Sequence, residues 1–369
     1  MAFSSFSCTG SSSSRLPCRE FRMDVLPAGE PGRFARRISG ETRGMTGRGS
    51  GLPAGITFLE LYRVQEPKEL HAAWNWRKNR AGEHIRARIG VNESGAAEIL
   101  DLHEKYHGPH GLIAGMTGSG KSELLQTLIL SLAVGYSPRE VCFLLIDYKG
   151  GGMSGLFDGL PHLAGQISNL SGSMVQRALL SIRSECRRRQ RLLKEAGCNH
   201  IDQYSASAAS GKEAMPHVFI IVDEFAELKQ EVPEFLGGLI STARIGRSLG
   251  IHLILATQKP GGTIDENIRS NTRFTLCLRV QDRLDSMEVL GKPDAAYFRQ
   301  PGRCCLQVGA GELSEVIQTG WSSAPFGKRR ERSGPALLLG SLGRPCKLHR
   351  RRSFGQEMGT ELRCRSSWP

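Results

Sequence analysis

The sequence lacks any apolar run long enough to cross a membrane. A transmembrane helix needs about 20 consecutive apolar residues, and no run in these 369 residues approaches that length. The opening stretch, MAFSSFSCTGSSSS, also lacks the apolar segment that a secretory signal peptide requires. We therefore expect no membrane span in this chain.

Paired cysteines of the C-x-x-C type are also absent. The ten cysteines are scattered, and several lie inside apolar runs, which is typical of reduced, cytosolic proteins. We expect Cys304 and Cys305 to pack in a strand, because adjacent cysteines rarely satisfy disulfide geometry. The spacing of His103, His107 and His110 suggests a metal, but no nearby cysteine completes a zinc ligand set. The sequence therefore favours neither a disulfide framework nor a zinc centre.

The central part of the chain lacks net charge. The formal charge is +13, but residues 1–50 carry +4 of it and residues 327–369 carry +8. Residues 51–326 are left with +1. The basic composition therefore lies in the two ends, and DNA binding cannot be inferred from charge alone.

Composition divides the chain into four parts. Residues 1–50 are rich in Ser, Gly and Arg without apolar periodicity, which predicts a disordered leader. Residues 51–100 form a lead-in segment that we expect to pack on the next part and to contain two strands. Residues 101–326 have the pattern of an α/β domain. Residues 327–369 lose that pattern, and we expect a basic tail that is disordered or not native to the domain.

Three short apolar runs in the α/β part predict strands that are buried on both faces. They span 141–146, 218–222 and 253–256, and each is followed by polar residues. In a parallel sheet these polar residues gather at one carboxyl edge, where open α/β sheets bind ligands. The fold class expected is therefore α/β, with a mainly parallel central sheet flanked by helices.

A phosphate-binding loop directly follows the apolar run 112–114. It fits the pattern G-x-x-x-x-G-K-[ST], in which backbone N–H groups and a helix N-terminus surround a phosphate. The lysine is expected to bridge the β- and γ-phosphates of ATP, and the final serine to ligate Mg²⁺. A chance glycine loop before a core helix is the alternative, and the strand, loop and helix together disfavour it. The loop residues are Gly115, Met116, Thr117, Gly118, Ser119, Gly120, Lys121 and Ser122.

Acidic and amide side chains at the ends of the other predicted strands would complete the site. Asp223 is expected to hold the Mg²⁺ shell, and Glu224 to orient and polarise the attacking water. Two solvated acids at a strand end are the alternative, which the phosphate-binding loop disfavours. Gln258 is expected to sense the γ-phosphate, although a polar strand cap would look the same. Asp147 and Lys149, before a run of three glycines, fit either a ligand contact or a simple turn.

Several segments resemble, in family order, the FtsK/SpoIIIE motors and especially the EssC/EccC ATPases of type VII secretion. The resemblance covers about residues 51–326, and its FLELY and DYKGG phrases are similar to the first ATPase module of the secretion branch. Family members carry membrane helices and several ATPase modules, whereas this chain resembles a single module with non-matching ends. The segments are GLPAGITFLELY, LDLHEKYHGPHGLIAGMTGSGKSE, LLIDYKGGG, LPHLAGQISNL, VDEFAELK, GIHLILATQKPGG, NIRSNTRFTLCLRVQD and LSEVIQTGWSSAPF.

The resemblance implies a RecA-like fold, a homohexameric ring, and ATP hydrolysis with Mg²⁺ that drives protein export. The implied partners are small helical secreted proteins and membrane components of the secretion system, and the implied place is the cytoplasmic side of the cell membrane. In such rings a neighbour supplies an arginine to the γ-phosphate. A run of charge on a helix is usually a solvated face, and each single arginine fits a structural role better than a catalytic one. The candidates are Arg177, Arg183, Arg269 and Arg273, with Arg187, Arg188, Arg189, Arg244 and Arg247 near them.

Two other functions remain as alternatives. A DNA translocase of the same family would be expected to have a basic ring lumen and a small DNA-reading domain. The near-neutral centre and the lack of a winged-helix pattern disfavour both features. An inactive nucleotide-binding module is the other alternative, and the complete set of Lys121, Ser122, Asp223 and Glu224 disfavours it.

Overall fold

The computed structural model describes most of the chain between residues 51 and 326. The described ranges are 51–147, 153, 155–168, 172–207, 213–309, 311–326, 337–339 and 345–347. The helices and strands of the described residues all lie in the unit Leu52–Pro369. The expected leader and most of the expected tail lie outside the described residues. Among the described residues, no helix is both long and apolar enough to span a membrane.

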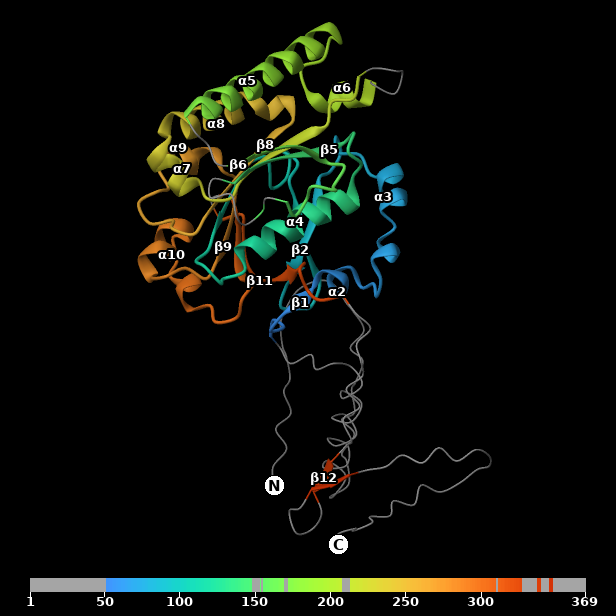
Figure 1. Cartoon of the computed structure of the whole chain (residues 1–369), viewed down its shortest axis with the longest axis vertical. Helices are drawn as coiled ribbons and strands as arrows, with labels where there is room; N and C mark the ends of the chain where they lie inside the picture. The colour runs from blue at the N-terminus through green and yellow to red at the C-terminus, as the bar shows by residue number, and fades with distance from the viewer. Residues whose placement is uncertain are drawn as a thin grey trace, which may run out of the picture. The chain divides into compact units, whose positions relative to one another are not determined.

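A parallel sheet forms the centre of the fold (Figure 1). Six neighbouring strands run in the same direction, in the order β9-β4-β8-β7-β5-β6. The three predicted runs are β5, β7 and β8, so the predicted fold class is confirmed. The strands are β4 (Gly111–Ala114), β5 (Val141–Asp147), β6 (Leu163–Ser168), β7 (His217–Val222), β8 (Ile251–Thr257) and β9 (Phe274–Leu278).

An antiparallel extension continues the same sheet beyond β9. Its order is β10-β11-β2-β3, and β1 pairs in parallel with the end of β11. The lead-in segment thus supplies β1, β2 and β3 to the sheet that holds the phosphate-binding loop. The strands are β1 (Ile56–Thr57), β2 (Arg86–Val91), β3 (Ala97–Asp101), β10 (Arg303–Val308) and β11 (Leu313–Trp321). Within 327–369, β12 (Leu337–Leu339) pairs with β13 (Pro345–Lys347).

Helices cover both faces of the sheet and bury two hydrophobic clusters. Leucines of α4 pack with β5 and alternate residues of β7 on one face. On the other face α5 and α8 lie side by side over the remaining residues of β7 and β8 (Figure 1). The helices are α2 (Phe58–Tyr62), α3 (Ala72–Lys78), α4 (Lys121–Gly135), α5 (Gly172–Glu195), α6 (Ile201–Ser207), α7 (Phe225–Glu231), α8 (Pro233–Gly246), α9 (Glu266–Asn271) and α10 (Arg283–Leu290). Short 3₁₀ turns are η1 (Pro67–Leu70), η3 (Arg247–Leu249) and η4 (Asp294–Tyr297).

The cysteine pair and the three histidines have partners that stabilise the fold. Cys304 and Cys305 are buried on β10 in different hydrophobic clusters. His103 Nε2 lies 3.2 Å from Asp202 Oδ2, and His110 lies between the Ala243 carbonyl and the Leu253 amide. The described residues contain no group of three or more potential ligands placed to hold a metal ion.

Side chains of α3 bind the last carbonyls of α4. Trp76 Nε1 donates to Ala133 O at 2.8 Å, and Asn79 Nδ2 donates to Gly135 O at 2.8 Å. The last carbonyls of a helix have no partner within the helix, so donors from elsewhere satisfy them. The lead-in segment therefore holds the end of α4 that is remote from the phosphate-binding loop.

We expect Trp76→Phe to lower the free energy of unfolding by about 1 kcal/mol, because it removes the indole N–H donor and leaves a smaller aromatic ring. Urea unfolding measures the change. Trp74→Phe is the matched control on the same helix, since the Trp74 side chain is largely exposed. Equal effects of the two substitutions would contradict a role for the Trp76 hydrogen bond.

Two carboxyl groups meet on the antiparallel extension. Burial and the neighbouring Glu315 raise the pKa of Glu98 on β3 from its ordinary value of 4.5 to about 7. The folded chain therefore keeps this proton at a pH where the unfolded chain releases it. The stabilisation from the protonated group is fully present below pH 4.5 and is lost as the pH rises through about 7.

We expect Glu98→Gln to raise the free energy of unfolding above neutral pH and to leave it nearly unchanged in mild acid. The amide stays neutral, so it removes the cost of ionising Glu98 beside Glu315. Urea unfolding of the wild type and the variant, at about pH 5 and about pH 8, measures this difference. Glu83→Gln, at an exposed position, serves as the control. A gain from Glu98→Gln that is equal at both pH values would contradict the account.

Candidate functional site

The phosphate-binding loop connects the end of β4 to the start of α4. Gly118 and Gly120 have φ angles of +76° and +99°, a region that residues with a Cβ rarely adopt. A Cβ on Gly120 would also lie 2.8 Å from the backbone nitrogen of Gly302. The loop can therefore follow this path only with glycine at these positions, and its backbone is left free to surround an anion.

Three backbone hydrogen bonds from distant segments hold the loop. Gly115 N donates to Thr257 O at 3.1 Å, and Met116 N donates to Arg279 O at 2.8 Å. Gly302 N donates to Ser119 O at 2.7 Å. The ends of β8 and β9 and the start of β10 thus fix the loop, as expected for a preformed phosphate site.

Lys121 and Asp223 are in direct contact at the carboxyl edge of the sheet. Lys121 Nζ lies 2.7 Å from Asp223 Oδ1 and 2.6 Å from the Asp223 carbonyl oxygen. Only 4% of the Lys121 side chain is exposed. A buried ammonium needs an anionic partner, and Asp223 provides it. Two residues that are 102 positions apart in the chain therefore belong to one site.

Glu224 is buried beside this pair, with its carboxylate turned toward the end of β8. Thr257 Oγ1 donates to Glu224 Oε1 at 2.6 Å. The Gln258 backbone nitrogen lies 3.2 Å from Oε1 and 3.0 Å from Oε2. These donors fix the orientation of the carboxylate while leaving lone pairs for a water molecule.

Gln258 connects the end of β8 to the tip of the phosphate-binding loop. Its Oε1 accepts a hydrogen bond from Thr117 Oγ1 at 2.6 Å. Ser122 is exposed in the first turn of α4. The structure thus brings Thr117, Lys121, Asp223, Glu224 and Gln258 together at one edge of the sheet.

Several features of this edge fit a nucleotide with a bound divalent cation. The glycine loop leaves room that a Cβ would fill, and the buried Ser119 Oγ has no hydrogen-bond partner among the described residues. Ser122 and Asp223 offer a hydroxyl and a carboxylate, which are the hard oxygen donors that Mg²⁺ prefers. The residues present are therefore suited to an anionic phosphate chain and to Mg²⁺.

Asp147, at the end of β5, has a local role in the structure. It is buried, and its Oδ2 accepts a hydrogen bond from Met153 N at 3.2 Å. Lys149 and the three glycines after it lie outside the described residues. The structure thus places Asp147 at the carboxyl edge, as the last residue of β5.

The candidate arginines differ in what they already contact. Arg269 Nη2 donates to Glu288 O at 2.7 Å, and Arg273 donates to Tyr106 O at 2.8 Å and to Glu312 Oε2 at 3.1 Å. Arg177 and Arg183 are exposed on α5.

Three of the neighbouring arginines lie close together in the sequence of α5. Arg189 is buried and donates to the carbonyls of Leu249 and Pro216. Arg188 pairs with Glu185 and Glu213, while Arg187 is exposed. Arg189 and Arg188 therefore have partners within their own protomer.

Sequence reasoning placed Thr257 among the polar residues at the carboxyl edge but gave it no role, and it missed the backbone groups that hold the loop. Thr257 precedes the predicted Gln258, so its position at a strand end was a usable signal. No sequence pattern marks Arg279 or Gly302 in this way. Their backbone groups reach the loop only because β9 and β10 pair in the sheet.

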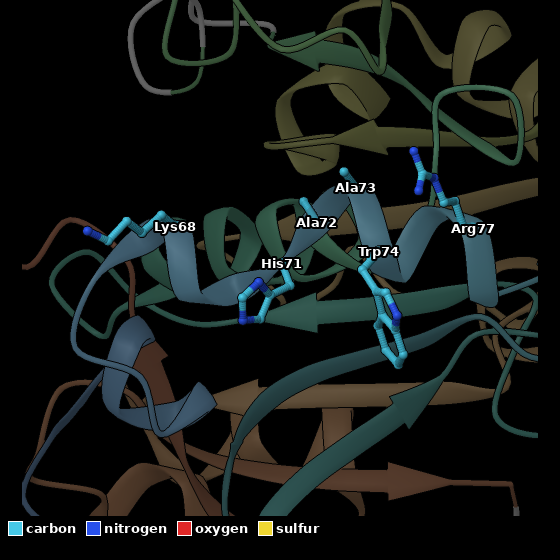
Figure 2. Close-up of a pocket in the computed structure, with 6 residues that line it drawn as sticks. All are labelled: Lys68, His71, Ala72, Ala73, Trp74 and Arg77. Atoms are coloured by element: carbon cyan, nitrogen blue, oxygen red, sulfur yellow. The ribbon is translucent and has the colours of Figure 1, made fainter.

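A hollow of about 420 Å³ lies along η1 and α3 (Figure 2). Lys78 Nζ lies 5.0 Å from the centre of the exposed Trp74 ring. Since α3 caps the C-terminus of α4, the 15-residue helix, about 20 Å long, separates this hollow from the phosphate-binding loop. The lining residues are Lys68, His71, Ala72, Ala73, Trp74 and Arg77.

The fold and the site define a P-loop ATPase of the RecA-like class. The model of the FtsK/SpoIIIE family matches residues 61–262, and the chain belongs to that family. This membership indicates an ATPase and a nucleotide-binding domain.

Two curated relatives share much of this sequence. The type VII secretion system protein EssC of Staphylococcus aureus (strain NCTC 8325) is 56% identical over 277 residues, which are 74% of this chain and 19% of that protein. The ESX secretion system protein YukB of Bacillus subtilis is 50% identical over 316 residues, which are 85% of this chain and 21% of that protein. The chain thus spans about a fifth of the length of these relatives.

Solved structures agree on the fold. The cytoplasmic domain of the Thermomonospora curvata type VII secretion ATPase EccC matches with a TM-score of 0.68 and 34% identity, over 74% of this chain and 33% of that one. ATPases 2 and 3 of the same EccC, in complex with a signal sequence peptide, match with a TM-score of 0.56 and 26% identity, over 66% and 43% of the two chains.

Proposed function

We propose that this chain binds ATP with Mg²⁺ and hydrolyses the nucleotide at the carboxyl edge of its parallel sheet. The contact between Lys121 and Asp223, with Glu224 adjacent, carries this proposal. Lys121 would exchange its contact with Asp223 for the β- and γ-phosphates. Because Lys121 is buried, its charge would act strongly on the phosphates.

Glu224 would accept a proton from the water that attacks the γ-phosphorus. The new bond joins the water oxygen to phosphorus, and the bond between the γ-phosphorus and the β-bridging oxygen breaks, which leaves ADP and phosphate. Gln258 would sense the γ-phosphate, supported by the contact between its side chain and the loop. When bound, Mg²⁺ would neutralise phosphate charge, and Ser122 and Asp223 would hold it.

We also propose that a neighbouring protomer completes the site with an arginine. The exposed Arg177 and Arg183 on α5 suit this role better than Arg269 and Arg273, whose guanidinium groups already bind their own chain. A homohexameric ring would place such an arginine at each site. Its positive charge would stabilise the charge that develops on the transferring phosphoryl group.

The relatives support a role in protein export. We propose that the chain acts as one ATPase module of a type VII secretion motor, with residues 51–100 as the lead-in and 101–326 as the ATPase domain. Its substrates would be small helical secreted proteins, and its partners the membrane components of the system. The module would work on the cytoplasmic side of the membrane. The identity to EssC and YukB supports this assignment.

We expect Glu224→Gln to keep ATP binding and to lower turnover by at least about 100-fold, because the amide preserves shape but cannot accept the proton. Lys121→Ala should instead weaken ATP binding by more than about tenfold, since it removes the charge on the phosphates. Binding of a fluorescent ATP analogue and phosphate release measure the two effects. Glu266→Gln, at an exposed position on α9, is the control. Unchanged binding and turnover in the Lys121 and Glu224 variants would refute the site.

A DNA translocase is the second candidate function, because the FtsK/SpoIIIE family includes DNA-pumping members. We expect long duplex DNA to leave the hydrolysis rate nearly unchanged, since residues 51–326 carry a net charge of only +1. The ATPase rate with and without DNA measures this. Heparin is the matched control, because the basic ends of the sequence would attract any polyanion through their charge. Strong stimulation by DNA but not by heparin would overturn the export assignment.

A further inference from the structure

Thr257 makes a direct contact with the proposed catalytic carboxylate. It is the last residue of β8 and is fully buried. Its hydroxyl lies 2.6 Å from Glu224 Oε1, 3.3 Å from the Lys259 carbonyl oxygen and 3.1 Å from the Lys259 backbone nitrogen. A hydroxyl has one hydrogen to donate. The short distance directs that hydrogen to Glu224, and the Lys259 N–H then donates to the hydroxyl oxygen.

This arrangement restricts the Glu224 carboxylate to one orientation. The Lys259 amide fixes the hydroxyl rotor, and the β-branched side chain of Thr257 restricts rotation about χ1. The Gln258 backbone N–H holds the carboxylate from the same strand end. A hydrogen bond to a charged group is stronger than one between neutral groups, so the Thr257 hydroxyl is a main determinant of the orientation.

The same residue also contacts the phosphate-binding loop. Its carbonyl oxygen accepts the hydrogen bond from Gly115 N, at the first residue of the loop. Thr257 therefore binds two parts of the site. Its carbonyl oxygen contacts the loop that would hold the phosphates, and its hydroxyl contacts the carboxylate that would activate water. Gln258 links the same two parts of the site, because its side chain accepts from Thr117 and its backbone N–H donates to Glu224.

We propose that Thr257 is a positioning residue that holds Glu224 in the orientation needed to accept the proton from the attacking water. The inference rests on the proposed function of Glu224. Thr257 itself would contact neither the nucleotide nor the water. Its effect is confined to the hydrolysis step, and ATP binding depends on Lys121 and the loop.

Two substitutions of Thr257 in the full chain test the proposal. Thr257→Val keeps the branched shape and removes the hydroxyl, whereas Thr257→Ser keeps the hydroxyl. We expect kcat to fall about 10- to 100-fold in Thr257→Val, with KM and the affinity for a fluorescent ATP analogue within about twofold of the wild type. Thr257→Ser should recover kcat to within about threefold. Phosphate release under steady-state conditions gives these values.

Thr263→Val is the matched control. Its hydroxyl is buried in the same segment and lies 2.7 Å from the Pro260 carbonyl oxygen and 3.1 Å from that of Lys259, but it does not contact Glu224. We expect this variant to retain kcat. In a Glu224→Gln background, Thr257→Val should lower the residual single-turnover rate by less than about twofold. The effects of substituting two residues that act as one unit are not additive.

Three results would overturn the positioning role. They are a Thr257→Val rate equal to or above the wild type, equal losses in Thr257→Val and Thr263→Val, and a full additional loss in the Glu224→Gln background. Failure of the proposed ATPase function would give a different result from failure of the positioning role. In that case Lys121→Ala and Glu224→Gln would leave ATP binding and turnover unchanged.

Discussion

The contact between Lys121 and Asp223 is the interaction on which the rest of this site depends. An isolated ammonium would be costly to bury, and Asp223 Oδ1, at 2.7 Å, compensates for its charge. The pair joins the start of α4 to the end of β7, with β8 between β4 and β7 in the sheet. A phosphate entering the loop would replace one anionic partner of Lys121 by another and release the Asp223 carboxylate for a cation. The buried ammonium of Lys121 is thus paired with an opposite charge from its own chain.

The rest of the fold supports the loop from several sides. Backbone groups at the ends of β8 and β9 and the start of β10 bind it directly. At the far end of α4, Trp76 and Asn79 of the lead-in segment bind the last carbonyls of the helix. The antiparallel extension, which includes β2 and β3, packs under α4. The lead-in segment is therefore part of the structure that positions the phosphate-binding loop.

Local sequence patterns predicted the elements whose structure depends on residues close together in the sequence. The buried strands β5, β7 and β8 follow from apolar runs, and the loop follows from its glycine spacing. The partners of these elements depend on sheet register, which no local pattern encodes. The hydrogen bonds from Thr257 to Glu224 and from Met116 to Arg279 form only once β8 and β9 take their places on either side of β4.

The most direct test of the central claim is a crystal structure of the chain with Mg²⁺ and a non-hydrolysable ATP analogue. The account predicts that Lys121 leaves Asp223 for the β- and γ-phosphates, and that Mg²⁺ lies between the phosphates and the side chains of Ser122 and Asp223. The Glu224 carboxylate should face the γ-phosphate with its bond to Thr257 intact. A nucleotide bound elsewhere, or a Lys121 that stays on Asp223 with the nucleotide present, would contradict the account.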